Sequence, residues 1–217
     1  MLNHWKTLAT VLLIFAAGCG GGQSPTTAIN GGEADQGPAL KKPASDPQHP
    51  VVLIETSMGN ISLRLDAEKS QSPGTVANFL AYANAGHYEQ TMVHQVCRGQ
   101  GFLAGGYGRD LVEKHPRTPI LNEARNGLKN RRGTIAMVRL PDSIDSATCQ
   151  FLINSADNPA LDHRDDTPEG YGYCVFGEVT DGMDVVDKIV AAPVQDSPEF
   201  DRMPTPMIVV KSIRQLQ

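Results

Sequence analysis

The pattern of apolar and polar positions becomes regular at residue 51. Residues 51–56 and 60–65 are rich in aliphatic and β-branched side chains, and a short link that contains Gly59 separates them. In the second run every other position is apolar, a period of two that is typical of a half-buried strand. Two such runs around a short link predict a β-hairpin.

Two segments show helical spacing instead. Ser72 and Pro73 suit the N-cap and the first position of a helix, apolar residues follow at positions 76, 79, 80 and 83, and Gly86 is placed to end it. A second helix is predicted to begin near Gly182, where acidic residues would lie at the positive end of the helix dipole. Its apolar positions 183, 186, 189 and 190 form one face. Both apolar faces are predicted to be buried.

Further strands are predicted at residues 134–138, 150–154, 174–179 and 207–213. Residues 92–137 also alternate short apolar runs with glycine, as barrel strands with bends do. The chain has many short strands, two isolated helices and no repeated strand–helix–strand unit. This pattern favours an all-β or an α+β fold and leaves both open.

The first residues have the pattern of an export signal. Lys6 precedes an apolar run over residues 8–17, which is shorter than the roughly 20 residues that a membrane-spanning helix needs. The run ends in Ala16-Ala17-Gly18-Cys19, small residues before a cysteine that resemble the lipobox of bacterial lipoproteins. We therefore expect residues 1–19 to be a signal peptide and Cys19 to be lipidated. Plain secretion with an incidental cysteine is the alternative.

Residues 20–50 contain almost no large apolar side chains and are rich in Gly, Pro, Gln, Ser, Asp and Thr. Such a stretch cannot bury enough surface to offset its conformational entropy, so it is predicted to be a disordered linker. The remaining residues 51–217 are long enough for one domain with its own core. A membrane-tethered, exported domain follows from these two predictions together.

Net charge, cysteine content and the lack of hydrolase motifs argue against several classes of function. The net charge of −5 is mild and no basic stripe occurs, which argues against nucleic acid as a partner. Beyond Cys19 the chain has Cys97, Cys149 and Cys174, so at least one thiol stays unpaired. We expect three buried thiols, with one disulfide as the alternative, and the spacing fits no zinc motif. No Gly-x-Ser-x-Gly or Cys–His hydrolase signature occurs in the sequence.

Three blocks in a fixed order carry a resemblance to a known family. Residues 122–137 (NEARNGLKNRRGTIAM), 146–154 (SATCQFLIN) and 172–189 (GYCVFGEVTDGMDVVDKI) resemble the cyclophilins, and the likeness extends over nearly all of residues 51–216. It implies a mainly β fold, a closed eight-stranded antiparallel barrel with an α-helix over each open end. It also implies a monomeric peptidyl-prolyl cis-trans isomerase that acts on proline-containing polypeptides without a metal or cofactor. With the export signal, the clients would be proteins outside the cytoplasm.

The cyclophilin reaction makes a specific electrostatic demand. Rotation about an X-Pro bond breaks amide resonance, a barrier of about 18–20 kcal/mol, and the family directs an arginine at the proline nitrogen of the twisted form. That arginine ends a Phe-His-Arg motif, which is Val93-His94-Gln95 here. Gln95 is thus the predicted catalytic residue, with a donor but no charge. Replacing a charged hydrogen bond by a neutral one is expected to slow turnover by roughly one to two decades.

The resemblance assigns further residues to substrate binding: Phe102, Leu103, Val138, Gln150, Leu152, Ala160, Leu161 and Tyr173. Only Gln150 and Leu161 match the family residue type, and Tyr173 is a tyrosine in many bacterial members. The apolar pair on the floor of the family's proline pocket falls on Gln100 and Gly101. We expect Gln95 and these residues to converge on one outer groove. Either a weakened isomerase or a non-catalytic peptide-binding module would fit them.

Several polar residues near these motifs have simpler explanations. His94 is expected to be a hydrogen-bonded structural residue. Arg98 and Arg139 are expected to be solvated surface arginines, although either could supply a replacement charge. Residues 162–166 (DHRDD) could bind a cation, but they fall in a loop that varies among bacterial cyclophilins, and no metal is expected.

Overall fold

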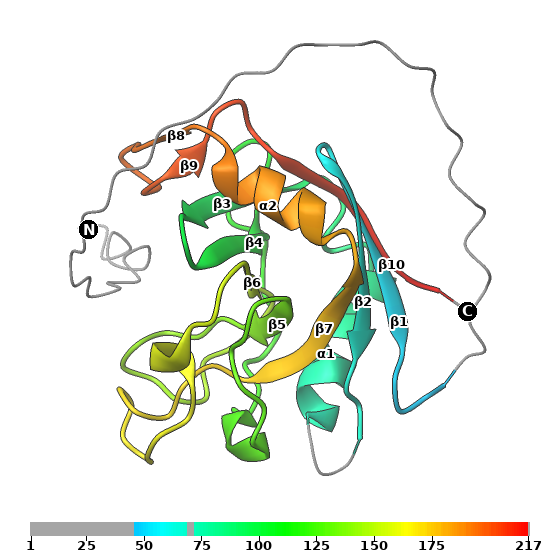
Figure 1. Ribbon diagram of the computed structural model, residues 1–217, viewed down its shortest axis with the longest axis vertical. Helices are drawn as coiled ribbons and strands as arrows, with labels where there is room; N and C mark the ends of the chain where they lie inside the picture. Colours follow the sequence, from blue (N-terminus) through cyan, green and yellow to red (C-terminus); the bar gives the residue numbers. More distant parts are fainter. Residues whose placement is uncertain (1–45, 69–71, 217) are drawn as a thin grey trace, which may run out of the picture.

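The computed structural model describes residues 46–68 and 72–216, and its main element is a closed antiparallel barrel (Figure 1). The strands follow one another around the barrel in the order β1-β10-β3-β4-β6-β5-β7-β2. Their bounds are β1 Val51–Thr56, β2 Gly59–Leu65, β3 Thr91–Cys97, β4 Gly101–Gly108, β5 Thr134–Met137, β6 Phe151–Asn154, β7 Val175–Asp181 and β10 Val209–Leu216. The predicted eight-stranded barrel is confirmed. The predicted signal peptide, the lipidation at Cys19 and most of the predicted linker lie outside the described residues.

The hairpin of β1 and β2 shows how the sequence pattern builds the barrel wall. Ile54 pairs with Ile61 across the two strands, and the alternating Ile61, Leu63 and Leu65 are fully buried inside. At the turn, Gly59 has a φ of +134°, and a Cβ there would lie 2.7 Å from Cγ2 of Val185. A side chain at residue 59 would therefore clash with Val185 on the helix that packs over this end of the barrel, and the positive φ also favours glycine.

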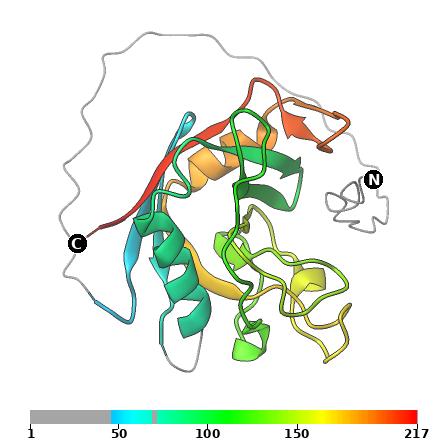
Figure 2. The ribbon, with the colours of Figure 1, turned by 180° about the vertical axis from the view of Figure 1, so that it is seen from behind.

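Two helices close the ends of the barrel, as predicted (Figures 1 and 2). Helix α1 (Pro73–Asn84) places Phe79 in the interior, where its ring centroid lies 5.2 Å from those of Tyr88 and Phe176. Helix α2 (Met183–Ala191) crosses the opposite end and buries a face that includes Val186 and Ile189. Aromatic and aliphatic side chains thus fill the interior of the barrel from both ends.

The N-terminus of α1 is capped differently from the prediction. Ser72 occupies the N-cap position but makes no capping bond, because its hydroxyl donates to the carbonyl of Asp66 over 2.9 Å. The carboxylate of Glu123 takes its place, accepting from the amides of Gly74 at 3.1 Å and Thr75 at 2.8 Å and from the Thr75 hydroxyl. A loop that is distant in sequence therefore holds the start of the helix.

A two-stranded ribbon outside the barrel was not predicted. Strands β8 (Val194–Gln195) and β9 (Met203–Pro204) pair with each other, and Phe200 and Met203 pack on Met92 of β3. His94 lies under this segment, 5.0 Å from the ring of Tyr107, with Nδ1 lacking a hydrogen-bond partner among the described residues. The expectation that His94 is structural agrees with this placement, but the expectation that it is hydrogen-bonded is wrong at Nδ1.

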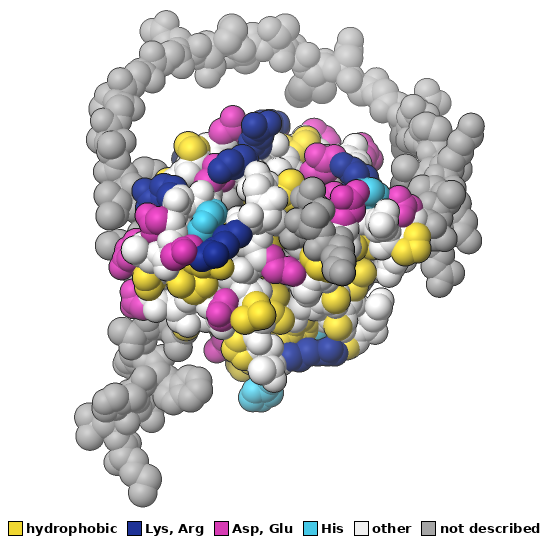
Figure 3. Space-filling view, turned by 90° about the horizontal axis from the view of Figure 1, so that it is seen from below, with side chains coloured by type: hydrophobic (Ala, Val, Ile, Leu, Met, Phe, Trp, Pro, Cys, Tyr) yellow, Lys and Arg dark blue, Asp and Glu magenta, His cyan; other side chains and the backbone are white. Residues whose placement is uncertain are grey.

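The described surface has no single-sign patch on the face shown in Figure 3, where lysine and arginine side chains are interspersed with aspartate and glutamate. This distribution agrees with the mild net charge of −5. None of the helices in the described part of the chain has both the length and the apolar character needed to cross a bilayer.

Candidate functional site

A row of side chains crosses the outer face of four neighbouring strands. Gln95 of β3 pairs with Leu103 of β4, Leu103 with Leu152 of β6, and Leu152 with Ala136 of β5. Directly opposite residues in antiparallel strands point to the same face of the sheet. The barrel therefore presents these residues side by side on its outside.

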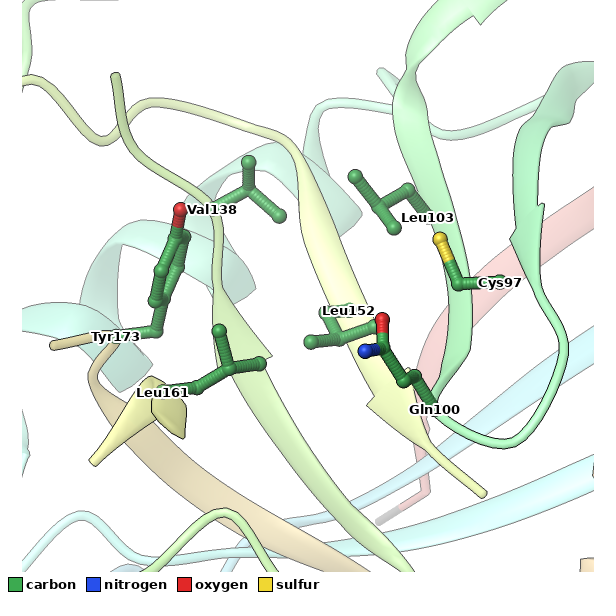
Figure 4. Close-up of a pocket in the computed structure, with 7 residues that line it drawn as sticks. All are labelled: Cys97, Gln100, Leu103, Val138, Leu152, Leu161 and Tyr173. Carbon is green, nitrogen blue, oxygen red and sulfur yellow. The ribbon is translucent and has the colours of Figure 1, made fainter. Parts of the chain in front are cut away.

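An apolar pocket is built on this row (Figure 4). It is lined by Cys97, Gln100, Leu103, Val138, Leu152, Leu161 and Tyr173. Cys97, Leu103, Leu152 and Leu161 form a buried cluster that is separate from the barrel interior. The one-turn helix η2 (Pro159–Leu161) supplies Leu161, and the segment before β7 supplies Tyr173. The strands, the turn and the loop together make a cavity whose exposed lining is almost entirely apolar.

The floor of the pocket carries an amide. Gln100 lies in the turn between β3 and β4, and its Oε1 is buried without a hydrogen-bond partner among the described residues. At the adjacent Gly101, a Cβ would lie 2.1 Å from the carbonyl oxygen of Ile153 and 2.9 Å from Cδ1 of Leu152. No side chain fits at residue 101, so Gln100 alone forms this part of the floor.

The structure brings together five of the nine residues that the resemblance assigned to the site: Leu103, Val138, Leu152, Leu161 and Tyr173. Phe102 is a correction, because it points into the barrel and belongs to the interior core with 1% exposure. Ala160 is exposed on η2 beside Leu161, and it does not line the pocket. Gln150 does not line the pocket either. Its side chain packs against Gly106, where an added Cβ would be 2.7 Å from Cγ of Gln150.

Gln95 borders the pocket without lining it. Its side chain is 6% exposed and shares the outer face with its cross-strand partner Leu103. The side-chain amide makes no hydrogen bond with the described residues, so packing around this buried residue is what orients it. None of the described residues that line the pocket carries a charge.

Arg139 is buried, which corrects the expectation of a solvated surface arginine. Its side chain donates to the carbonyls of Gly172 at 3.0 Å, of Leu140 and Pro141 at 2.8 Å each, and of Pro168. The guanidinium carbon also lies 5.3 Å from the centroid of the Tyr173 ring. Arg98, by contrast, is exposed as expected.

A network of buried asparagines lies behind the pocket and holds its backbone. Asn158 donates to the carbonyl of Gln100 at 2.9 Å and to Oδ1 of Asn154 at 2.6 Å. Asn130 donates to the carbonyls of Leu161 at 3.0 Å and Tyr173 at 3.4 Å. Three residues that line the pocket are thus positioned by amide groups from elsewhere in the chain.

The three thiols of the described residues are buried and unpaired, as expected. Burial raises the pKa of Cys97, of Cys149 to about 11 and of Cys174 to about 12, so each thiol stays protonated at neutral pH. Cys97 contributes apolar surface to the pocket and was not among the predicted site residues. Alternation along β3 from Gln95 could have found it, since residues two apart on a strand share a face.

Two carboxylates of the candidate cation site at residues 162–166 are engaged in other contacts. Asp162 accepts from the backbone amide of Asn130 at 2.7 Å, and Asp166 pairs with Arg125. Across residues 46–68 and 72–216, no three His, Cys, Asp or Glu side chains come together as metal ligands.

Comparison with known proteins agrees with this architecture. A family profile described as cyclophilin type peptidyl-prolyl cis-trans isomerase/CLD matches residues 51–215. The chain belongs to the cyclophilin-type peptidyl-prolyl cis-trans isomerase family. It is 44% identical over 163 residues to peptidyl-prolyl cis-trans isomerase A of Dickeya dadantii, covering 75% of this chain and 83% of that protein. It is 41% identical over 163 residues to peptidyl-prolyl cis-trans isomerase B of Escherichia coli, covering 75% and 98%.

The cyclophilin fold is also found among solved structures. The crystal structure of a cyclophilin type peptidyl-prolyl cis-trans isomerase of Cryptosporidium parvum, determined in the presence of the dipeptide Ala-Pro, matches with a TM-score of 0.61 at 24% identity. The match covers 77% of this chain and 99% of that one. At this identity the likeness shows the fold alone.

Proposed function

We propose that this cyclophilin isomerises X-Pro bonds in exported polypeptides and that the proline ring enters the pocket between β4, β6 and η2. The observation that carries the proposal is the convergence of Leu103, Leu152 and Leu161 on one outer pocket next to Gln95. A pyrrolidine ring has only C–H groups on its exposed edge, so an apolar pocket of this kind favours it by the hydrophobic effect.

Catalysis in this site is expected to be slower than in a cyclophilin that has the family arginine. Gln95 offers a neutral donor, whose hydrogen bond stabilises by about 0.5–1.5 kcal/mol, whereas bonds to charged groups contribute about 1.5–3 kcal/mol. A difference of about 1.4 kcal/mol corresponds to one decade in rate. The reaction needs no covalent intermediate, so a weaker donor slows rotation without abolishing it.

A non-catalytic peptide-binding module is the second candidate. The absence of charge among the described pocket residues favours it, because binding a proline needs only the apolar wall. The two functions differ in the cis–trans exchange rate of a bound peptide. A binding module that holds the cis, trans and twisted forms equally tightly does not lower the rotational barrier, so it leaves the exchange rate unchanged.

We further propose that the protein is exported and held at a membrane through a lipid on Cys19. This rests on the apolar run over residues 8–17 and on Ala16-Ala17-Gly18-Cys19 in the sequence. Residues 20–50 would then be the tether between the lipid and the barrel. Cys19→Ser is expected to move the protein from the membrane fraction to the soluble exported fraction. An unchanged membrane fraction would contradict lipidation at this residue.

The isomerase proposal is tested by a protease-coupled assay on short X-Pro peptides, with wild type, Gln95→Ala and Gln95→Arg. The wild type is expected to accelerate isomerisation, Gln95→Ala to lose most of the acceleration and Gln95→Arg to exceed the wild type by about tenfold. A silent wild type whose Gln95→Arg variant is also silent, while both bind a proline peptide, would establish the module instead.

A further inference from the structure

Arg139 is a buried arginine that joins two backbone segments behind the pocket. It is 5% exposed, and its side chain donates to the carbonyls of Leu140 and Pro141 on one side and of Gly172 and Pro168 on the other. No carboxylate within the described residues forms an ion pair with it. Its hydrogen bonds therefore hold together the segment that follows β5 and the loop that precedes β7.

The guanidinium also lies behind one wall of the pocket. Its carbon is 5.3 Å from the centroid of the Tyr173 ring. Tyr173 lines the pocket and Arg139 does not, so the ring separates the guanidinium from the pocket. Val138 lines the pocket as well, because neighbours on an extended chain point to opposite sides. Figure 4 shows the Tyr173 ring along this wall, with its hydroxyl oxygen next to Val138.

Hydrogen bonds hold only the backbone of Tyr173. Its amide donates to the carbonyl of Leu161 at 2.9 Å, and its carbonyl accepts from Asn130 at 3.4 Å. Its hydroxyl makes no hydrogen bond with the described residues. The position of the ring therefore depends on the groups that pack against it, and the Arg139 guanidinium is one of them.

We propose that Arg139 is a positioning residue that sets the width of the pocket and makes it selective for the five-membered ring of proline. The inference rests on the proposed isomerase function, because it assumes that this pocket receives the proline ring. With the guanidinium in place, the Tyr173 ring cannot move outward, and a larger ring in the pocket would be overpacked against it. Without the guanidinium there is space behind the ring, and the wall can move.

The shape of arginine explains its use at residue 139. Its planar guanidinium stacks on aromatic rings and presents donors in a fixed fork, which here reaches carbonyls of both segments. Lysine carries the same charge on one compact ammonium group, which neither stacks as a plane nor spans the same carbonyls. Arg139→Lys therefore keeps the charge and removes the support of the wall.

The test compares two peptides that differ by one methylene, Ala-Pro and its homologue with six-membered pipecolic acid in place of proline. NMR titration of the full chain gives a Kd for each peptide, and exchange spectra give the catalysed rate for Ala-Pro. The wild type is expected to bind Ala-Pro about tenfold more tightly than the homologue. In Arg139→Lys this ratio is expected to fall below about threefold. General destabilisation would weaken both peptides alike and leave the ratio unchanged.

The chain contains a matched control. The guanidinium carbon of Arg125 lies 5.4 Å from the ring centroid of Tyr171, but Tyr171 does not line the pocket. Arg125→Lys removes the same kind of contact from a ring outside the site, so it should keep the wild-type ratio of the two Kd values.

An Arg139→Lys variant that folds and keeps the wild-type ratio would overturn the role of Arg139 and leave the isomerase proposal standing, as would a wild type that binds both peptides equally. If Arg139→Lys does not fold, Tyr173→Leu shortens the wall itself and should lower the ratio in the same way; an unchanged ratio would overturn the inference. A wild type that neither binds Ala-Pro nor accelerates its exchange would overturn both proposals.

Discussion

The buried amide of Gln100 makes the clearest quantitative prediction about the pocket. Its Oε1 is buried without a partner among the described residues, and Gln100 lies on the floor next to Leu152 (Figure 4). An unsatisfied buried polar group costs about 1–3 kcal/mol. Gln100→Leu keeps a similar volume and removes the polar atoms. We expect the free energy of unfolding to rise by about 1 kcal/mol.

The same substitution is expected to tighten binding of proline. A pyrrolidine ring offers neither a donor nor an acceptor, so its contact with the unsatisfied amide of Gln100 is less favourable than its contact with an apolar side chain of the same size. The difference is expected to be about 1 kcal/mol, which corresponds to a roughly fivefold lower Kd for Gln100→Leu. The assays are urea denaturation and calorimetric titration with a short Ala-Pro peptide. Gln215→Leu, exposed on β10, is the matched control and should change neither quantity.

Weaker peptide binding by Gln100→Leu would refute this reasoning. It would mean that the amide forms a hydrogen bond with the peptide, and that the occupant of the pocket carries a donor that a proline ring lacks.

Two further predictions concern the stability of the barrel. Glu123→Ala removes the acceptor for the amides of Gly74 and Thr75, so the free energy of unfolding should fall by about 1–2 kcal/mol, whereas exposed Glu169→Ala should have no effect in the same denaturation experiment. Burial lowers the pKa of His94 from 6.5 to about 4, so the folded state excludes a proton that the unfolded state binds. Its stabilising contribution is complete above pH 6.5 and is lost as the pH falls toward 4, by up to about 3 kcal/mol. His94→Leu should flatten this part of the stability curve, and parallel curves for the two proteins would show that His94 is not the group responsible.

Local patterns predicted the parts of the fold that depend on one segment. The alternation over residues 60–65 and the apolar face of residues 183–190 correspond to β2 and α2 because each buries its face against a single core. Strands β8 and β9 have two residues each, too few to leave a periodic signal. Barrel closure came from the family resemblance, since pairing of β4 with β6 joins segments that no local pattern connects.

At the site, too, local patterns predicted some features, while others depend on segments that are distant in sequence. Placing both Phe102 and Leu103 in one groove was inconsistent with strand geometry, because neighbours on a strand point to opposite faces. The burial of Arg139 could not be read locally either, since two of its acceptors, Pro168 and Gly172, lie in a distant loop. The same holds for Glu123, which caps a helix 48 residues away in sequence.

The most direct test of the central claim is exchange NMR of an Ala-Pro peptide with the ¹⁵N-labelled chain, which reports rotation and binding site in one sample. The proposed function predicts faster cis–trans exchange, with amide shifts centred on Leu103, Leu152 and Leu161. An unchanged exchange rate, or shifts on another face of the barrel, would contradict the assignment of this pocket as the isomerase site.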